Sequence, residues 1–405
     1  MAIRTINTRR FFITLFSLFC CASISAPALA QNDTFSQCLI EFGELAKQQG
    51  VSESTQQLVA DLKYQAKVIE LDRSQPEFVQ TFPAYFGKRV NEWRINKGRQ
   101  MYAKHKAFLA KLNTKYGIPG HYLMAFWGLE TNFGGYKGNM PILDSLATLA
   151  CDERRKTFFT QELILALKLV DREKLEPSLM QGSWAGAMGH TQFMPSTYTQ
   201  YAIDGDDDGL INLWESEEDA LASAANFLSR LGWKSGLRWG REVKLPDGFD
   251  YSLAGKNGKR TISEWRELGM LNAQGEPLPA SDIQAILRVP AGYAGPVFLS
   301  YANFNTIMRW NNSEFYAIAV GHLADRIING APLAAELPDL PPIPRSEIRA
   351  IQLALLDKGY DVGGADGIIG PATRAGLRLF QREQGLVADG FPSIEVRQQL
   401  GVQTR

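Results

Sequence analysis

The sequence predicts a mainly α-helical (α+β) protein with a small β-sheet inserted into a helical domain and a three-helix domain at the C-terminus. Apolar residues recur at helical spacing over residues 35–112 and again over 315–328. Short β-prone runs, separated by Pro, Gly and Asn turns, occupy residues 236–301. A proline-rich stretch then precedes the last segment, and a length of 405 residues favours two domains.

The N-terminus, residues 1–30, is typical of a signal peptide. Three arginines within the first ten residues precede an apolar run over residues 11–23, and Ala-Pro-Ala-Leu-Ala ends at Ala30. We therefore expect export and cleavage after Ala30, with the mature domain starting at residue 31. A lipid anchor on Cys20 or Cys21 is the alternative, and the bulky Phe19 before them disfavours it.

The helical segment over residues 121–129 is unusually apolar for a helix of a water-soluble domain. It leads into Glu130, and Gly134 and Gly135 follow as helix-stopping residues. Phe126 and Trp127 lie one turn before Glu130, so desolvation should raise the pKa of its carboxyl group. Such a carboxyl can act as a general acid near neutral pH. The alternative is an ordinary surface glutamate.

The segments after residue 235 are predicted to form a sheet, a linker and a C-terminal helical domain. The inserted sheet is predicted from the β-prone runs 242–245, 285–289 and 297–299. Residues 331–344 contain five prolines and are predicted to form a semi-rigid, extended linker. Over residues 345–405, helical spacing on both sides of the turn Asp366-Gly367, with Pro371 at a first helical position, predicts a compact helical domain.

Composition excludes one class of partner. The 43 basic and 43 acidic residues give a formal net charge of +0, so nothing supplies the electrostatic term that dominates binding to nucleic acid. After removal of the leader, Cys38 and Cys151 are the remaining thiols. Export permits a disulfide between them. Two buried free thiols are equally compatible with the sequence.

A second motif occupies residues 181–195 and is rich in Gly, Ala and Ser, which permit close backbone approach. Ser183 and Gln192 can hydrogen-bond an uncharged polar substrate, while Trp184, Phe193 and Met194 offer faces for sugar stacking. The alternative is a tight packing turn whose aromatic residues belong to the core. The histidines, His190 among them, show no metal-ligand spacing.

Taken together, these motifs resemble the B-type lytic murein transglycosylases of the goose-lysozyme-like group, over residues 35–328. The matching segments are Trp127-Gly128-Leu129-Glu130-Thr131-Asn132-Phe133-Gly134, Gly182-Ser183-Trp184-Ala185-Gly186-Ala187-Met188-Gly189, Gln192-Phe193-Met194-Pro195, Tyr116-Gly117-Ile118-Pro119, Asn212-Leu213-Trp214, Tyr301-Ala302-Asn303-Phe304 and Asn311-Asn312-Ser313 with Tyr316. Trp310 stands where some relatives have Tyr, and His190 where others have Pro or Tyr.

The resemblance implies a lysozyme-like catalytic domain over residues 31–330 that cuts the β-1,4 bond between N-acetylmuramic acid and N-acetylglucosamine without water. Glu130 would protonate the leaving oxygen and then take a proton from the C6 hydroxyl of muramic acid, closing a 1,6-anhydro ring. By matching position, Ser183, Gln192, Asn311 and Tyr316 would contact the substrate. A lysozyme-type hydrolase or a non-catalytic peptidoglycan-binding protein is the alternative.

The run Asp204-Gly205-Asp206-Asp207-Asp208-Gly209 has the spacing of the start of an EF-hand-like calcium loop. Glu215 occupies the usual closing position, whereas the resemblance favours Asp219 in a longer loop. We expect no required cofactor and at most a structural calcium ion at Asp204, Asp206, Asp208 and Asp219. A solvated acidic turn is the alternative.

The segment 345–405 is similar to the three-helix peptidoglycan-binding domain. It would act as a tether that raises the concentration of the catalytic domain near an insoluble polymer. The expected partners are peptidoglycan glycan strands, with cell-wall assembly proteins as a second class, and the expected location is the periplasm.

Overall fold

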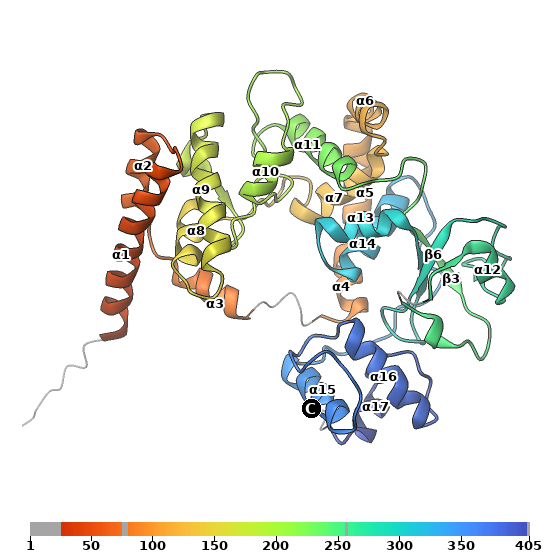
Figure 1. Cartoon of the computed structure of the whole chain (residues 1–405). Coiled ribbons are helices and arrows are strands. Elements are labelled where there is room, and N and C mark those ends of the chain that lie inside the picture. Colours follow the sequence, from red (N-terminus) through yellow and green to blue (C-terminus); the bar gives the residue numbers. More distant parts are fainter. Residues whose placement is uncertain (1–25, 75–79, 256–257, 403–405) are drawn as a thin grey trace, which may run out of the picture.

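The computed structural model describes residues 26–74, 80–255 and 258–402 and confirms the mainly helical (α+β) architecture (Figure 1). Two helical lobes, a β-rich insert and a C-terminal helical domain follow one another across the molecule. Most of the predicted leader, residues 1–25, lies outside the described residues. None of the helices in the described part is long and apolar enough to span a membrane.

The first lobe is a set of helices packed around a continuous apolar core. Its helices are α1 (Ala26–Gln48), α2 (Glu53–Ala60), α3 (Ala66–Ser74), α8 (Ile142–Ala150), α9 (Lys156–Glu173) and α10 (Pro195–Tyr201). Leu146, Leu163 and Leu167 are fully buried where α8 and α9 pack together. Two short strands, β1 (Met140–Pro141) and β2 (Gln181–Gly182), pair as an antiparallel ribbon, and a loop follows β2.

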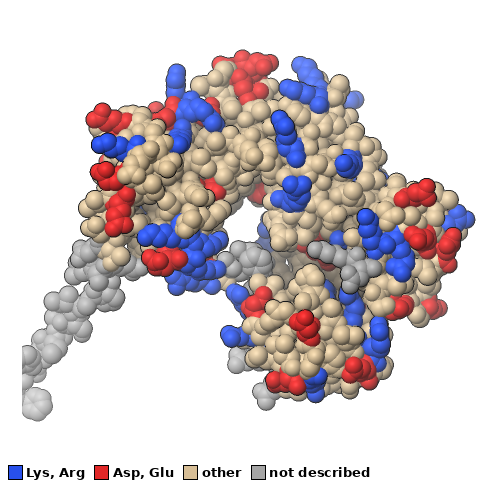
Figure 2. Space-filling model, in the orientation of Figure 1, with Lys and Arg blue, Asp and Glu red and all other residues tan. Residues whose placement is uncertain are grey.

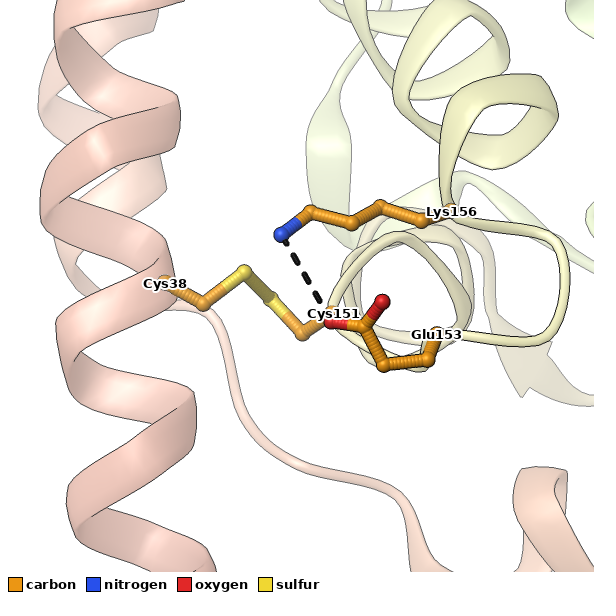
Figure 3. Close-up of a disulfide and its surroundings, with 4 residues drawn as sticks. All are labelled: Cys38, Cys151, Glu153 and Lys156. Atoms are coloured by element: carbon orange, nitrogen blue, oxygen red, sulfur yellow. Dashed lines mark ion pairs between the residues drawn. A yellow bond between two sulfur atoms is a disulfide. The ribbon is translucent and has the colours of Figure 1, made fainter.

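A disulfide bonds Cys38 on α1 to Cys151 at the C-terminal end of α8 (Figure 3). The two Cα atoms lie 5.9 Å apart, although 113 residues separate them in sequence. The structure therefore selects the disulfide among the two alternatives that the sequence left open. Its effect is to hold the first described helix against the middle of the lobe.

The second lobe carries the largest core and surrounds one central helix. It consists of α4 (Phe82–Arg89), α5 (Glu92–Lys104), α6 (Lys106–Tyr116), α7 (Gly120–Thr131), α11 (Glu217–Arg230), α13 (Ala302–Trp310) and α14 (Glu314–Ile327). Helix α7 packs against α5, α6, α11 and α14, which explains why its sequence is apolar on all sides. The predicted helix over residues 121–129 is thus confirmed.

The insert is a five-stranded antiparallel sheet in the order β4-β6-β7-β3-β5. Its elements are β3 (Gly240–Lys244), β4 (Arg260–Thr261), α12 (Ile262–Glu267), β5 (Leu271–Asn272), β6 (Gln284–Arg288) and β7 (Val297–Ser300). Three of these strands coincide with the predicted runs. Trp265 on α12 is fully buried against the sheet, and a capping box between Thr261 and Glu264 starts that helix.

The C-terminal domain has the predicted three helices, α15 (Arg345–Asp357), α16 (Pro371–Glu383) and α17 (Ile394–Gln399). The preceding linker contains no helix or strand, as its prolines predict, but it packs against the rest of the chain. Leucines at positions 333, 337 and 340 pack on the core of the second lobe. Glu242 accepts hydrogen bonds from the backbone of Ala334 and Ala335, and Thr81 donates one to Leu340. The linker is thus held against the second lobe and the inserted sheet.

Candidate active site

The candidate site is built at the C-terminal end of α7, where Glu130 leaves the apolar core. Most of the helix before it is buried, whereas Glu130 keeps a partly exposed edge. The helix ends at Asn132 in the left-handed conformation. This is two residues earlier than the glycine pair marked as the stop in the sequence, since asparagine also tolerates that conformation.

The backbone after Glu130 makes a sharp turn of unusual geometry. Asn132, Phe133 and Gly134 have φ values of 53°, 59° and 80° in succession. A left-handed phenylalanine is strained, and such strain persists only where its surroundings fix it. The Phe133 ring packs edge-on against Trp127 and over Gly128, where a Cβ atom would lie 2.6 Å from the ring. Gly128 therefore makes room for the turn.

A buried arginine holds the two sides of this turn together. The Arg94 Nε donates to the carbonyl of Gly128 at 2.9 Å, and its Nη2 donates to Oδ1 of Asn132 at 2.5 Å. Its Nη1 donates to the carbonyl of Arg89 at the end of α4. Arg94 thus satisfies helix-end acceptors on both sides of Glu130 and fixes the position of its backbone.

Two side chains from the following helices fix the carboxyl group of Glu130. Trp310, the last residue of α13, donates its Nε1–H to Oε1 at 2.9 Å. The hydroxyl of Tyr316, in the first turn of α14, donates to the same oxygen. No hydrogen bond to Oε2 comes from any residue in the described part of the chain. One oxygen is anchored, and the other is free to exchange a proton.

The environment makes this carboxyl a weak acid. Desolvation by burial raises the pKa of Glu130 to about 7, against the opposing effects of the Tyr316 and Trp310 hydrogen bonds and of the Arg89 charge. Burial next to Glu130 also raises the pKa of Tyr316 well above its ordinary value. Tyr316 therefore stays a proton donor. Glu130 can exist in both protonation states near neutral pH, as an acid and base must.

The floor of the site is aromatic and rigid. The Trp310 ring lies 4.5 Å from Phe126, 5.2 Å from Phe227 and 5.4 Å from Phe193, measured between ring centroids. A small apolar cavity beside Glu130 is lined by Trp310, Phe126 and neighbouring side chains, among them Thr191. Trp310 therefore has little freedom to move its N–H away from the carboxyl group.

The loop after β2 holds two of the predicted substrate residues. Gly182 is obligatory there because a Cβ atom would lie 2.1 Å from the carbonyl oxygen of Ala187. The Ser183 hydroxyl accepts the Ala187 N–H at 3.0 Å. Gln192, with φ of 50°, donates its amide to the carbonyls of Lys137 and Gly189. The carbonyl oxygen of that side chain is the group it can offer to a ligand.

The predicted site residues thus fall into two sets. Tyr316 touches Glu130, and exposed Asn311 follows Trp310 directly. Ser183 and Gln192 make no hydrogen bond to Glu130. Ser183 accepts the Ala187 N–H, and Gln192 donates to the carbonyls of Lys137 and Gly189. His190 is buried and accepts the Trp127 indole N–H at 2.9 Å, in keeping with the structural role expected for it.

Sequence reasoning missed two contributors. Trp310 was noted only as a departure from the pattern of relatives, yet it is a direct partner of Glu130. Arg94 carries no motif signal, because an arginine within a long amphipathic segment looks like a surface residue. Only its burial in the structure identifies Arg94 as part of the site.

The acidic loop brings together carboxylate oxygens of Asp204, Asp206 and Asp219 within 4.8 Å of one another. Asp208 does not join this group; it accepts the backbone N–H of Leu210 instead. Asp219 is buried at the start of α11, and its burial raises the pKa of its carboxyl group. An all-oxygen donor set of this kind fits a hard cation such as calcium.

Two family models match the chain. The transglycosylase SLT domain matches residues 34–325, and a putative peptidoglycan binding domain matches residues 344–400. Among curated proteins, the membrane-bound lytic murein transglycosylase B of Escherichia coli is 34% identical over 249 residues. That match covers 60% of this chain and 66% of the relative, slightly under two thirds of its length.

Solved structures extend the likeness to nearly the whole chain. SltB3 from Pseudomonas aeruginosa, in complex with NAG-anhNAM-pentapeptide, is 40% identical with a TM-score of 0.87, covering 91% of this chain and 99% of that one. The Escherichia coli lytic transglycosylase Slt35 in complex with calcium is 30% identical with a TM-score of 0.62, covering 72% and 92%. The chain therefore belongs to the transglycosylase SLT domain family and carries a peptidoglycan-binding domain at its C-terminal end.

Proposed function

We propose that the chain is a lytic murein transglycosylase that cleaves the β-1,4 bond between N-acetylmuramic acid and N-acetylglucosamine. One observation carries the proposal: Glu130 has a pKa near 7 and one unengaged carboxyl oxygen. Among the described residues that line the adjacent cavity it is the only acid. Hydrolytic glycosidases generally need a pair of carboxyl groups, whereas intramolecular ring closure needs one.

The reaction then takes two proton transfers through the same oxygen. In the first, Oε2 of protonated Glu130 gives its proton to the glycosidic oxygen as the bond from C1 of muramic acid breaks. In the second, the resulting carboxylate takes the proton of the C6 hydroxyl while O6 bonds to C1. Trp310 and Tyr316 stabilise the transient carboxylate through Oε1. The product is a 1,6-anhydromuramic end, and no water is consumed.

The substrate contacts are part of the same proposal. Ser183, Gln192 and Asn311 would bind the sugars with their polar groups. The position of Tyr316 supports a different role from simple contact, because its hydroxyl is engaged with Glu130. We therefore assign it to holding the carboxyl group in place.

A digestion experiment tests this function. Purified peptidoglycan is incubated with the wild type and with Glu130→Gln, and soluble fragments are identified by mass spectrometry. Anhydro-muropeptides from the wild type alone are expected. Reducing ends would instead identify a lysozyme-type hydrolase. Equal release by both proteins would remove Glu130 from the mechanism, and no release by either would favour a non-catalytic binding protein.

The leader, the two domains and the acidic loop have proposed roles as well. Residues 1–30 would be a cleaved leader that sends the protein to the periplasm, residues 31–330 the catalytic domain, residues 331–344 the linker and residues 345–405 the wall-binding domain. Peptidoglycan strands are the partner, with cell-wall assembly proteins as possible further ones. The reaction requires no cofactor, and calcium bound by Asp204, Asp206 and Asp219 would stabilise the fold.

A further inference from the structure

The C-terminal domain contains the same structural unit twice. In each copy a helix presents a buried glutamine, Gln352 on α15 and Gln381 on α16, to a later Ala-Asp-Gly loop. The first loop contains Asp366 and the second contains Asp389. The copies share four hydrogen bonds between corresponding atoms, and Gln352 donates one more, to Thr373.

In the first copy the Gln352 amide donates to Oδ1 of Asp366 at 3.1 Å and to the carbonyl of Ile368 at 3.0 Å. Its carbonyl accepts the Gly367 N–H at 2.8 Å, and Oδ1 of Asp366 accepts the Ile368 N–H.

In the second copy Gln381 makes the matching bonds to Oδ1 of Asp389 at 2.8 Å and to the carbonyl of Phe391 at 3.0 Å. Its carbonyl accepts the Gly390 N–H at 2.7 Å, and Oδ1 of Asp389 accepts the Phe391 N–H. The two loops therefore have one geometry, with Oδ1 used inside the loop and Oδ2 facing outward.

The outward oxygen of the second loop is occupied by the catalytic part of the chain. Oδ2 of Asp389 accepts the backbone N–H of Tyr293, in the turn between β6 and β7, at 2.8 Å. The same turn approaches so closely that a Cβ atom on Gly292 would lie 2.8 Å from this oxygen. Asp389 is buried, 3% exposed, by this contact. The second loop thus binds a peptide amide.

The first loop presents the same acceptor, Oδ2 of Asp366, at the surface. Asp366 is exposed, and within the described residues no hydrogen bond reaches its Oδ2. Arg345 donates its Nε to the Asp366 carbonyl at 3.1 Å and extends into an open hollow between this domain and the turn after α8. Figure 2 shows basic side chains on both sides of the opening between the first lobe and the C-terminal domain.

Two of the three arginines that line the hollow are paired with aspartates. Arg73 is paired with Asp152 and Arg154 with Asp72, at 2.6 and 2.8 Å. Arg345 has no acidic partner within 4.0 Å among the residues that the structure describes. An acceptor for an amide N–H therefore lies beside a guanidinium that has no acidic side chain within 4.0 Å among the described residues, at an open surface.

We propose that the Asp366 loop and Arg345 bind the peptide stem of peptidoglycan, with an amide N–H on Oδ2 of Asp366 and a stem carboxylate on Arg345. The inference rests on the proposed function, which makes peptidoglycan the substrate. The bond between Asp389 and Tyr293 is an internal example of the same recognition. The N-acetyl groups of the glycan also offer an N–H, but they carry no carboxylate for Arg345.

Binding of the full-length chain tests the proposal without any need for cleavage. In a Glu130→Gln background, dissociation constants are measured by co-sedimentation with intact sacculi and by titration calorimetry with the peptide-free glycan strands that an amidase releases from them. Titration calorimetry with a free stem tetrapeptide gives a third value. Asp366→Asn keeps Oδ1 and replaces Oδ2 by a donor, while Arg345→Gln removes the charge. The matched controls are Asp361→Asn and Arg349→Gln, exposed residues of the same domain.

Each site variant is expected to weaken binding to intact sacculi and to the tetrapeptide about tenfold, the scale of one charge-assisted hydrogen bond. The controls should stay within about twofold, and melting temperatures confirm that every variant is folded. Site variants that bind like their controls would overturn the proposal. So would site variants that lose as much affinity for the peptide-free glycan strands as for intact sacculi, which would assign the site to the sugar acetamido groups. Failure of the proposed function would appear separately, as a wild-type digest without anhydro-muropeptides.

Discussion

Replacing Glu130 by glutamine should make the protein more stable above about pH 4.5, with the full effect at neutral and alkaline pH. The folded state raises the pKa of this carboxyl from 4.5 to about 7 by desolvation. Below pH 4.5 the group is protonated in both the folded and the unfolded state, so it costs nothing. Between these values the unfolded state ionises while the folded state does not, and the folded state loses stability progressively.

The size of the effect follows from the same values. At about 1.4 kcal/mol per pH unit, a pKa difference between 4.5 and about 7 corresponds to about 3 kcal/mol at pH 8. Glutamine removes this cost because it carries no charge, and its carbonyl oxygen can still accept the hydrogen bonds of Trp310 and Tyr316. A buried carboxyl that weakens the fold is expected at a site selected for reactivity, in keeping with the role proposed for Glu130.

Urea unfolding of the wild type and Glu130→Gln at pH 4, 6 and 8 measures the difference directly. The variant should match the wild type at pH 4 and exceed it by about 3 kcal/mol at pH 8. Glu41→Gln, a substitution of an exposed glutamate on α1, is the control and should show no such trend. A variant of equal or lower stability at pH 8 would refute the desolvation argument.

Three further predictions concern other parts of the structure. Tyr316→Phe removes a donor to the carboxylate, so the alkaline limb of kcat/KM should move to higher pH by about one unit; a fixed or lower limb would contradict this. Cys38→Ser should lower the unfolding free energy by about 2–4 kcal/mol, measured in urea without reductant, and unchanged stability would argue against the bond. Millimolar calcium should raise the melting temperature of the wild type but not of Asp219→Asn, and an equal response would exclude this site.

Local sequence patterns predicted the elements better than their arrangement. The apolar run before Glu130 predicted helix α7, because a helix that is apolar on all sides must be buried. The three β-prone runs likewise became β3, β6 and β7. The strand order β4-β6-β7-β3-β5 was out of reach, since it depends on contacts between distant segments.

The site was predictable only where a motif carried it. Glu130 and Tyr316 lie in recognisable segments, and the structure brings them into contact across 186 residues. Arg94 acts through backbone carbonyls, so no complementary charge in the sequence announces it. The disulfide could not be chosen over two free thiols, because it depends on how α1 packs against α8. The attachment of the linker was missed because the proline-rich pattern gives no sign that its leucines pack on the core of the second lobe.

The fastened linker changes what a wall-binding domain can contribute. A loose tether would let the site sample any bond within its reach. Here the linker is hydrogen-bonded to Glu242 and Thr81, and Asp389 of the C-terminal domain accepts a hydrogen bond from Tyr293. Under the proposed function, these contacts would hold the wall-binding domain at a set distance from Glu130, so that cleavage would fall at a set length of strand from each anchoring point.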